Sequence, residues 1–323
     1  MGDPRAPSRA GSVLLVKVFV AGASGAIGRP LIPQLLEAGH EVTGMTRSEG
    51  SAAVLTAAGA TPVVVDVFDA DALAAAVATA APEVVVHELT AIPENLDPRK
   101  MEPQFETTNR LRTEGTRNLL AAARASGARR VVAQSIAFAY APRKDGLHDE
   151  DDPLWAEATP IYAAVQELED QVLGADGLEG IVLRYGFFYG PGTSYAADSG
   201  TAAAVRKRQF PVMGGGRGEW PFIHIADAAS ATVAAVERGS PGAYNVVDDE
   251  PAPLREWLPA FAEAIGAKRP MRVPKFVARL AAGKMATHYG TALRGASNAR
   301  FKREFGWEPG YASWREGFRE GLG

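Results

Sequence analysis

The chain has no cysteine among its 323 residues, which excludes disulfides, thiolate metal sites, iron–sulfur clusters and a cysteine nucleophile. It also lacks a long hydrophobic run. The run from Val13 to Ala21 covers about nine residues and has no Ala-x-Ala cleavage pattern, whereas a membrane helix needs about 20. Neither sign of charge dominates, since the formal net charge is −4, so the basic footprint of a nucleic-acid or membrane binder is missing. These absences predict a soluble, cytoplasmic protein whose partner is a small molecule.

The sequence is instead rich in short apolar runs that alternate with Ala/Leu-rich helical stretches. Strands that are apolar throughout are typical of a parallel sheet buried on both faces, so the pattern predicts an α/β, doubly wound (Rossmann) fold. The predicted strands are Val13–Ala21, Glu41–Thr46, Pro62–Asp66, Glu83–His87, Arg130–Ser135 and Gly180–Tyr185. The predicted helices are Ile27–Ala38, Ala52–Ala58, Ala70–Ala80, Gln104–Ser126 and Ile161–Leu173.

This rhythm breaks after about residue 186, where glycine and proline cluster. We therefore expect residues 12–186 to form a dinucleotide-binding domain, with residues 222–247 returning to it. Residues 187–221 and 248–323 are expected to form a smaller, C-terminal substrate-binding lobe.

The most specific local motif is a glycine-rich turn between the first strand and the first helix. Gly22, Gly25 and Gly28 allow a tight turn, close approach to a pyrophosphate and close packing of helix on strand. The residues between them, Ser24, Ala26 and Ile27, bring backbone amides to the start of a helix, where anions bind. The motif predicts a dinucleotide site.

The end of the second strand distinguishes NAD from NADP. An acidic residue there binds a ribose 2′-hydroxyl, whereas arginine suits a 2′-phosphate. The chain carries Arg47 and Ser48 at this point, so we expect NADP rather than NAD. At the end of the third strand, Asp66 and the Val67 amide are expected to contact the adenine, while Asp69 suits the N-cap of the next helix.

Motifs along nearly the whole chain resemble the extended short-chain dehydrogenase/reductase family, the NAD-dependent epimerase/dehydratase group. They are Gly22 to Gly28, Asp66-Val67, Val86-His87, Thr108-Asn109, Gly115-Thr116-x-Asn118-Leu119-Leu120, Gln134-Ser135, Tyr162, Leu183-Arg184-Tyr185-Gly186-x-x-Tyr189-Gly190-Pro191-Gly192, Phe222 to Asp227, and Phe305-Gly306-Trp307-x-Pro309. The resemblance implies cofactor contacts at Leu89, Thr90 and Phe187 as well, and pairing of two copies through the helices at 104–126 and 161–173. It implies no metal.

In that family a Ser or Thr polarises the reacting oxygen and a Tyr-x-x-x-Lys pair moves the proton. The resemblance assigns these roles to Ser135 and to Tyr162, 27 residues further on, but Gln166 stands where the lysine is expected. Gln166 can hydrogen-bond a ribose but brings no charge. A lysine about 4–5 Å from the phenol would stabilise the phenolate by roughly 3–4 kcal/mol, or about 2–3 pKa units.

Without that lysine we expect the pKa of Tyr162 to stay near its ordinary value of about 10, so that Tyr162 donates a proton but is a poor base. This favours an oxidoreductase that runs from NADPH toward reduced product, acting on a carbonyl or related group. Sugar-type epimerase or dehydratase chemistry, which needs a base, is one alternative. A cofactor-binding sensor without turnover, with Tyr162 as a packing residue and Ser135 satisfying a strand end, is another.

A second departure from the family lies at the end of the fourth strand, which reads His87-Glu88-Leu89-Thr90. We expect Glu88 to pair with Arg110 or Arg112 from the following helix, the alternative being a base near the substrate. His87 is expected to be a hydrogen-bonded core residue.

Overall fold

A seven-stranded parallel sheet forms the centre of the molecule, in a computed structural model that describes residues 15–93, 96–97 and 100–323. The strand order is β11-β6-β5-β4-β1-β2-β3. The strands are β1 (Lys17–Ala21), β2 (Glu41–Thr46), β3 (Thr61–Val64), β4 (Val84–His87), β5 (Arg130–Ile136), β6 (Glu179–Tyr185) and β11 (Gly242–Val246). The predicted doubly wound fold is confirmed, and each predicted strand lies within about two residues of an observed one where the structure describes it. Residues 12–14, where we placed the start of the domain and of the first strand, lie outside the described residues.

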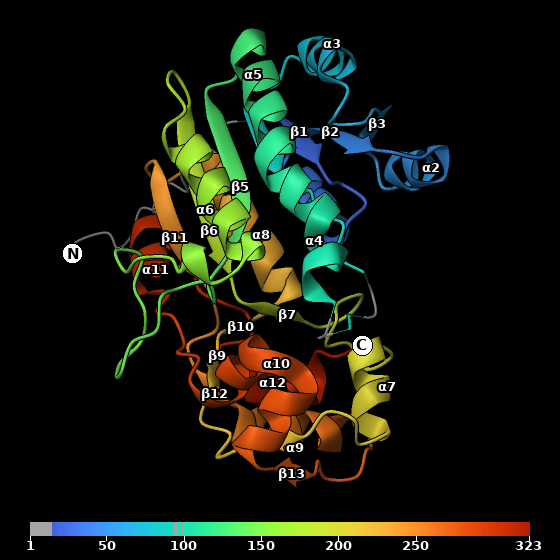
Figure 1. The fold of residues 1–323 in the computed structure, drawn as a ribbon. Helices are drawn as coiled ribbons and strands as arrows, with labels where there is room; N and C mark the ends of the chain where they lie inside the picture. Colours follow the sequence, from blue (N-terminus) through green and yellow to red (C-terminus); the bar gives the residue numbers. More distant parts are fainter. Residues whose placement is uncertain (1–14, 94–95, 98–99) are drawn as a thin grey trace, which may run out of the picture.

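The sheet is buried on both faces because its strands are apolar throughout. Val18, Val20, Val84 and Val86 pack into one core cluster, and Phe19, Ala21 and Val85 pack into another. Helices cover both faces. They are α1 (Gly28–Glu37), α2 (Glu49–Ala57), α3 (Ala70–Ala80), α4 (Met101–Arg110), α5 (Thr116–Ser126), α6 (Pro160–Leu173) and α8 (Ile225–Glu237). Helices α4, α5 and α6 lie in front of the sheet in Figure 1, and α8 lies behind it.

The long helix predicted over 104–126 is one helical unit with an irregular centre. A π-helical stretch, η1 (Leu111–Gly115), joins α4 to α5. Such π-helical turns widen a helix locally and are frequent at functional sites. Helix α6 packs against both α4 and η1, so this irregular stretch faces the helix that carries Tyr162.

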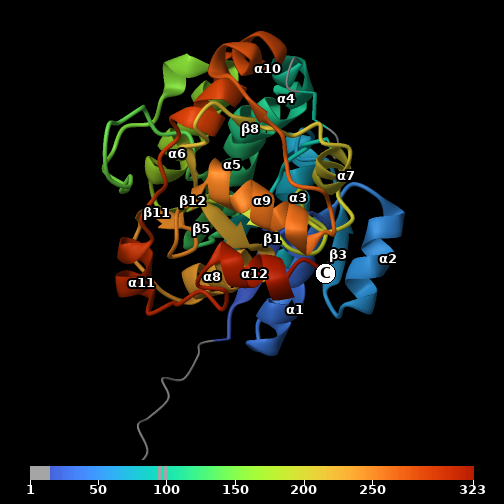
Figure 2. The ribbon, with the colours of Figure 1, turned by 90° about the horizontal axis from the view of Figure 1, so that it is seen from below.

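A second group of elements covers the carboxyl ends of the strands. It comprises β7 (Phe187–Tyr189), α7 (Gly200–Arg206), β8 (Val212–Met213), β9 (Glu219–Trp220), β10 (Phe222–His224), β12 (Ala252–Pro253), α9 (Leu254–Ala264), β13 (Arg272–Val273), α10 (Lys275–Thr291) and α12 (Trp314–Glu320). Figure 1 shows α9, α10 and α12 together below the sheet, joined to it through the β7–β10 pair, and Figure 2 shows the molecule from that side. Its core is aromatic, with Trp257, Trp314, Phe222 and Phe261 fully buried.

Helix α11 (Ala299–Phe305) returns to the sheet and packs beside β11. Among the described residues, no helix combines the length and apolarity that a membrane span requires.

Candidate nicotinamide-dinucleotide and substrate site

The glycine-rich turn between β1 and α1 has the geometry of a phosphate cradle. Gly22 has φ +95°, and a Cβ there would lie 2.6 Å from the Glu88 carbonyl oxygen. A Cβ on Gly28 would lie 2.3 Å from the Ala23 carbonyl oxygen, so both positions require glycine. No side chain caps the start of α1, where Ile27 is the N-cap residue. The first turn of α1 therefore offers backbone N–H groups to an anion.

Two arginines lie at this end of the sheet, one after β2 and one after the third glycine of the turn. Arg47 follows β2 and is exposed, as the sequence suggested. Arg29, which the sequence reading missed although it follows the third glycine directly, donates from Nε to the Ser24 carbonyl oxygen at 3.3 Å. A hollow of about 180 Å³ lies between the turn and α2 and is lined in part by Ser24, Arg29 and Ser51.

Two other predicted residues at this end already have local hydrogen-bond partners. The Ser48 hydroxyl caps α2 by accepting from the Ser51 backbone N–H at 3.2 Å. Asp66 is exposed and accepts from the Phe68 backbone N–H, whereas Asp69 caps α3 as predicted. The Val67 carbonyl oxygen accepts from Asn118, which ties the β3–α3 loop to α5.

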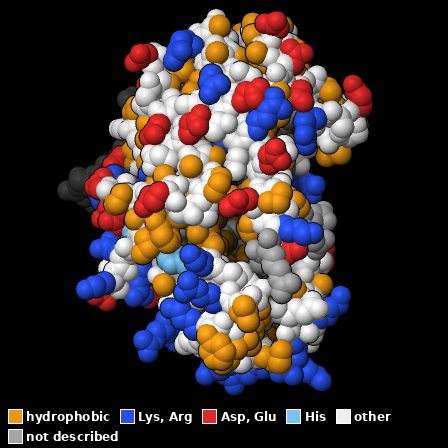
Figure 3. Space-filling view, viewed as in Figure 1, with side chains coloured by type: hydrophobic (Ala, Val, Ile, Leu, Met, Phe, Trp, Pro, Cys, Tyr) orange, Lys and Arg blue, Asp and Glu red, His pale blue; other side chains and the backbone are white. Residues whose placement is uncertain are grey.

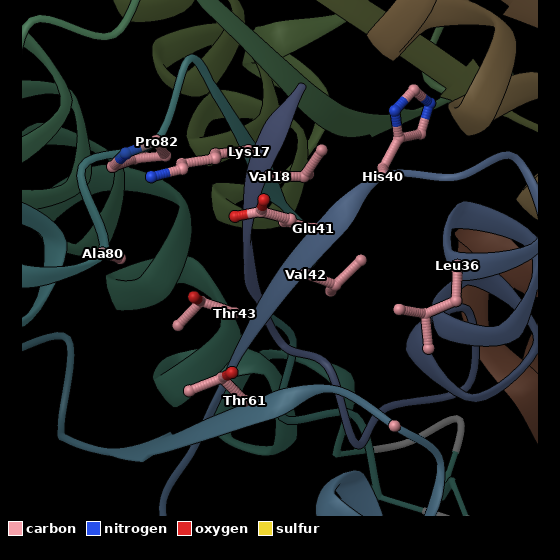
Figure 4. A pocket seen from close by; sticks show the side chains of 11 residues that line it. Lys17, Val18, Leu36, His40, Glu41, Val42, Thr43, Thr61, Ala80 and Pro82 are labelled. Carbon is pink, nitrogen blue, oxygen red and sulfur yellow. The ribbon is translucent and has the colours of Figure 1, made fainter. Parts of the chain in front are cut away.

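A larger surface pocket, of about 390 Å³, lies at the opposite edge of the sheet (Figure 4). Lys17, Glu41 and Thr61, which begin β1, β2 and β3, are among its lining residues. Ligands of open parallel sheets bind at the carboxyl ends of the strands, so this amino-end pocket is unsuited to the dinucleotide.

The end of β4 corrects one prediction. Glu88 is 5% exposed and pairs with neither predicted arginine, because Arg110 on α4 binds Glu114 one turn along at 2.6 Å. The Tyr185 hydroxyl donates to Glu88 at 3.4 Å, and burial raises the pKa of the Glu88 carboxyl well above its usual range. Burial therefore disfavours the charged form of Glu88, which is not half of an ion pair among the described residues. Leu89 and Thr90 follow it at the same edge of the sheet.

His87 is a hydrogen-bonded core residue, as predicted. Its Nε2 lies 3.0 Å from the Thr116 hydroxyl, and its Nδ1 accepts from the Leu89 backbone N–H. Burial and the nearby Arg112 charge lower the pKa of His87 to about 4.

Ser135, to which the family resemblance assigns the polarising role, has a hydrogen-bond partner within the protein. Its hydroxyl is buried and donates to the Glu169 carboxylate on α6 at 2.5 Å. The same carboxylate holds the Arg184 guanidinium, with Nη2 at 2.6 Å and Nε at 3.0 Å. Ser135 therefore belongs to a buried ion-pair cluster between β5, β6 and α6.

Tyr162 and Gln166 are on the same face of α6 but bind different groups. The Tyr162 hydroxyl lies 2.9 Å from the Phe138 carbonyl oxygen and 2.6 Å from the Tyr289 hydroxyl. Because a carbonyl oxygen only accepts, Tyr162 donates to Phe138 and accepts from Tyr289. Gln166 donates instead to Asp170, one turn along, at 2.8 Å.

The pKa of Tyr162 departs from our expectation of a value near 10. Burial and the contact with Tyr289 raise it well above that value, and the Arg112 charge offsets this only in part. The phenol is therefore protonated throughout the physiological pH range.

A cluster of aromatic side chains, which we call the aromatic site, surrounds the Tyr162–Tyr289 pair where the two lobes meet. Phe138 and Phe187 stack with ring centroids 3.9 Å apart, and Phe187 lies 4.3 Å from Trp220. Tyr289, from α10, packs edge-on against Phe138. The space-filling view shows hydrophobic side chains around a hollow between the lobes (Figure 3). The sequence pointed to Phe187 and not to Tyr289, whose role arises only from the approach of α10.

The chain belongs to the NAD dependent epimerase/dehydratase family, whose model matches residues 18–246. It is 47% identical over 307 residues to a 3-diazoavenalumate denitrifying reductase from a Streptomyces species, covering 94% of this chain and 99% of that protein. It is 30% identical over 284 residues to 4-hydroxy-2-methyl-3-oxo-4-farnesyl-3,4-dihydroquinoline-1-oxide ketoreductase from Stigmatella aurantiaca, covering 86% and 80% of the two chains.

Solved structures match the fold. A dTDP-glucose 4,6-dehydratase from Streptomyces venezuelae, with NAD bound, superposes with a TM-score of 0.75 at 20% identity, covering 94% of this chain and 95% of the other. Family and relatives together define an oxidoreductase of the short-chain dehydrogenase/reductase type with a nucleotide-binding Rossmann fold.

Proposed function

We propose that the chain is an NADPH-dependent reductase that removes a diazo group from a small organic acid as dinitrogen. The observation that carries the proposal is that the three side chains expected to transfer the proton are not hydrogen-bonded to one another. Ser135, Tyr162 and Gln166 bind Glu169, Phe138 and Asp170, respectively, rather than one another. The Streptomyces relative, named for denitrifying reduction of a diazo acid, supports the same chemistry.

The residues present fit a bound dinucleotide. The cradle of Gly22, Gly25 and Gly28, whose Cβ positions are filled by neighbouring backbone, would hold the pyrophosphate. Arg47 and Arg29 would hold the 2′-phosphate, which favours NADP over NAD. Asp66 and Val67 would meet the adenine, and Leu89, Thr90 and Phe187 would line the nicotinamide side. When bound, NADPH supplies a hydride, which is one proton together with two electrons.

Reductive loss of a diazo group balances without a proton from the protein. In the diazonium form, R–N₂⁺ and H⁻ give R–H and N₂: the hydride forms the new C–H bond, and dinitrogen leaves with the electron pair of the C–N bond. A buried phenol that keeps its proton, an uncharged Gln166 and an occupied Ser135 do not hinder this reaction. Epimerase and dehydratase chemistry needs a base, which a Tyr162 with a pKa well above 10 cannot supply.

Carbonyl reduction is the second candidate. The protonated Tyr162–Tyr289 pair could deliver a proton to a developing alkoxide after breaking the bond to Phe138. The ketoreductase relative supports this candidate. The relatives with assigned reactions are enzymes, which argues against a sensor without turnover.

Isotope labels distinguish removal of a diazo group from carbonyl reduction, because they show where the hydride and the nitrogen atoms go. We expect the protein, given NADPH deuterated at C4 and ¹⁵N-labelled 3-diazonio-4-hydroxybenzoate, to release one N₂ per NADPH oxidised and to place deuterium on the ring carbon. Reactions without protein and with heat-denatured protein measure the spontaneous rate. A rate no higher than these controls, together with turnover of ketone substrates, would establish carbonyl reduction instead.

Tyr162→Phe provides a test within the site. We expect N₂ release to change less than about 5-fold, whereas carbonyl reduction should fall about 100-fold or more on loss of its proton donor. Since burial keeps the Tyr162 phenol protonated, we also expect no tyrosine-dependent change in the rate between about pH 6 and 9. Steady-state kinetics across that range measure both effects, with Tyr244→Phe, at a tyrosine on β11 outside the site, as the control. A Tyr162-dependent rise in rate with pH would contradict the proposal.

We further propose that the protein works in the cytoplasm as a homodimer. The absence of cysteine is compatible with any redox compartment, and α4, α5 and α6 form a continuous helical layer on one face of the sheet (Figure 1). A mass of about one chain by light scattering would refute the dimer.

A further inference from the structure

Among the described residues, Arg112 is a buried cation with no carboxylate paired to it. Its side chain leaves the π-helical stretch η1 and is 6% exposed. Its Nη1 is buried and has no hydrogen-bond partner, and no ion pair joins Arg112 to any of the described residues. Other buried arginines here are paired: Arg184 binds Glu169, and Arg130 binds Glu179 and three backbone carbonyl oxygens.

The Arg112 guanidinium lies beside the aromatic site. Its charge acts on the pKa of both Tyr162 and Tyr289, and η1 packs against α6, which carries Tyr162. Burial lowers the pKa of Arg112 to about 10, so the group is still cationic at neutral pH. Removing one partner of a buried ion pair is costly because it leaves a charge uncompensated. No described residue compensates the buried Arg112 charge in this way.

The surroundings of Arg112 indicate what would compensate its charge. The Tyr162–Tyr289 pair lies beside Arg112, and the Phe138 and Phe187 rings pack around that pair, so the site offers flat ring surfaces that suit a planar aromatic ligand. A guanidinium binds carboxylates and phenolates through planar, charge-assisted hydrogen bonds. The pyrophosphate and 2′-phosphate of a dinucleotide are assigned to the other end of the site, at the β1–α1 turn and Arg47.

We propose that Arg112 binds an oxyanion of a planar aromatic substrate, a carboxylate or a phenolate on the ring that carries the departing group. This deepens the proposed function and rests on it for the reaction, but the binding itself requires no turnover. Arg112 then orients the ring against the Tyr162–Tyr289 pair and selects anionic over neutral aromatic compounds.

Stable nitro analogues of the diazo probe test the binding. The titrations use 4-hydroxy-3-nitrobenzoate at pH 8, where carboxylate and phenolate are both charged, its methyl ester, its methyl ether, and the compound with both groups blocked. Isothermal titration calorimetry with the NADP⁺-loaded protein gives each affinity. We expect Arg112→Met to weaken the dianion about 10- to 100-fold, the loss of one charge-assisted hydrogen bond, and to leave the doubly blocked compound unchanged.

The singly blocked compounds identify the oxyanion, because only the one that keeps it should lose affinity in Arg112→Met. Arg112→Lys, which restores charge without the planar fork, should recover part of the loss. Arg110→Met, two residues away on an exposed pair with Glu114, is the matched control and should change nothing. Because it removes an uncompensated charge, Arg112→Met should also raise the melting temperature of the ligand-free protein.

Three results would overturn the proposal: no binding of any of the four compounds to the wild type, equal loss for the charged and the doubly blocked compounds, or a lower melting temperature for Arg112→Met. These readouts are independent of N₂ release. A protein that binds the dianion through Arg112 but releases no N₂ would refute the proposed reaction and leave this inference intact.

Discussion

Replacing Glu169 by alanine should lower the free energy of unfolding by about 3–5 kcal/mol. Glu169 and Arg184 are almost completely buried, and the carboxylate also accepts from Ser135. Burial alone would lower the pKa of Arg184, but its bonds to Glu169 outweigh burial and raise the pKa above its ordinary value. Without Glu169, the guanidinium keeps its charge and loses the main group that compensates it.

Urea denaturation measures this loss, with the midpoint and the slope fitted separately so that a change in the unfolded state is detected. Glu114→Ala, which breaks the exposed pair with Arg110, is the control and should leave stability unchanged within error. The double variant Glu169→Leu with Arg184→Met should recover most of the loss, because it removes both charges together. If Glu169→Ala alone were as stable as the wild type, water rather than Glu169 would compensate the Arg184 charge, which would contradict the prediction.

The second large effect is expected at the cofactor. Arg47→Asp should weaken NADPH binding about 100-fold, because it removes a charge-assisted hydrogen bond to the 2′-phosphate and adds a repelling charge. NADH, which has a hydroxyl at that position, should bind as well as before or better, since aspartate accepts from that hydroxyl. Fluorescence titration with each nucleotide measures the reversal.

The substitution Arg29→Met distinguishes the contribution of Arg29 to NADPH binding from that of Arg47. It should weaken NADPH less than Arg47→Asp does, because it removes a charge without introducing repulsion. Arg303→Asp, an exposed arginine on α11, is the control for net charge. If neither nucleotide binds the wild type, the β1–α1 turn does not serve a dinucleotide, and both the cofactor assignment and the proposed function fail.

The backbone of the dinucleotide-binding half was readable from the sequence. Apolar strands, Ala/Leu-rich helices and the Gly22–Gly28 turn are local patterns, since each depends on residues within a few positions of one another. The caps are local too: Asp69 caps α3 through a group three residues away. The helix over 104–126 was predicted in extent, but the π-helical stretch at its centre was not, because nothing in the spacing marks the added turn.

The chemistry of the site was decided by tertiary contacts. Tyr162 and Tyr289 are 127 residues apart in sequence, and their contact exists because α10 packs beneath the sheet. The family resemblance supplied Ser135 and Tyr162 as residues but not the direction of their hydroxyls, which Glu169 and Phe138 determine. Glu88 was expected to pair with Arg110 or Arg112, yet burial raises the pKa of Glu88, and among the described residues no ion pair joins Arg112 to a carboxylate.

The sequence by itself therefore determined the fold, the family and the glycine-rich turn between β1 and α1, because backbone conformation follows from local patterns. Only the tertiary structure decided which polar side chains are hydrogen-bonded or ion-paired within the protein and which can bind a ligand. A side chain's partner and its degree of burial depend on elements that are distant in sequence, and these two quantities set its protonation and its chemistry.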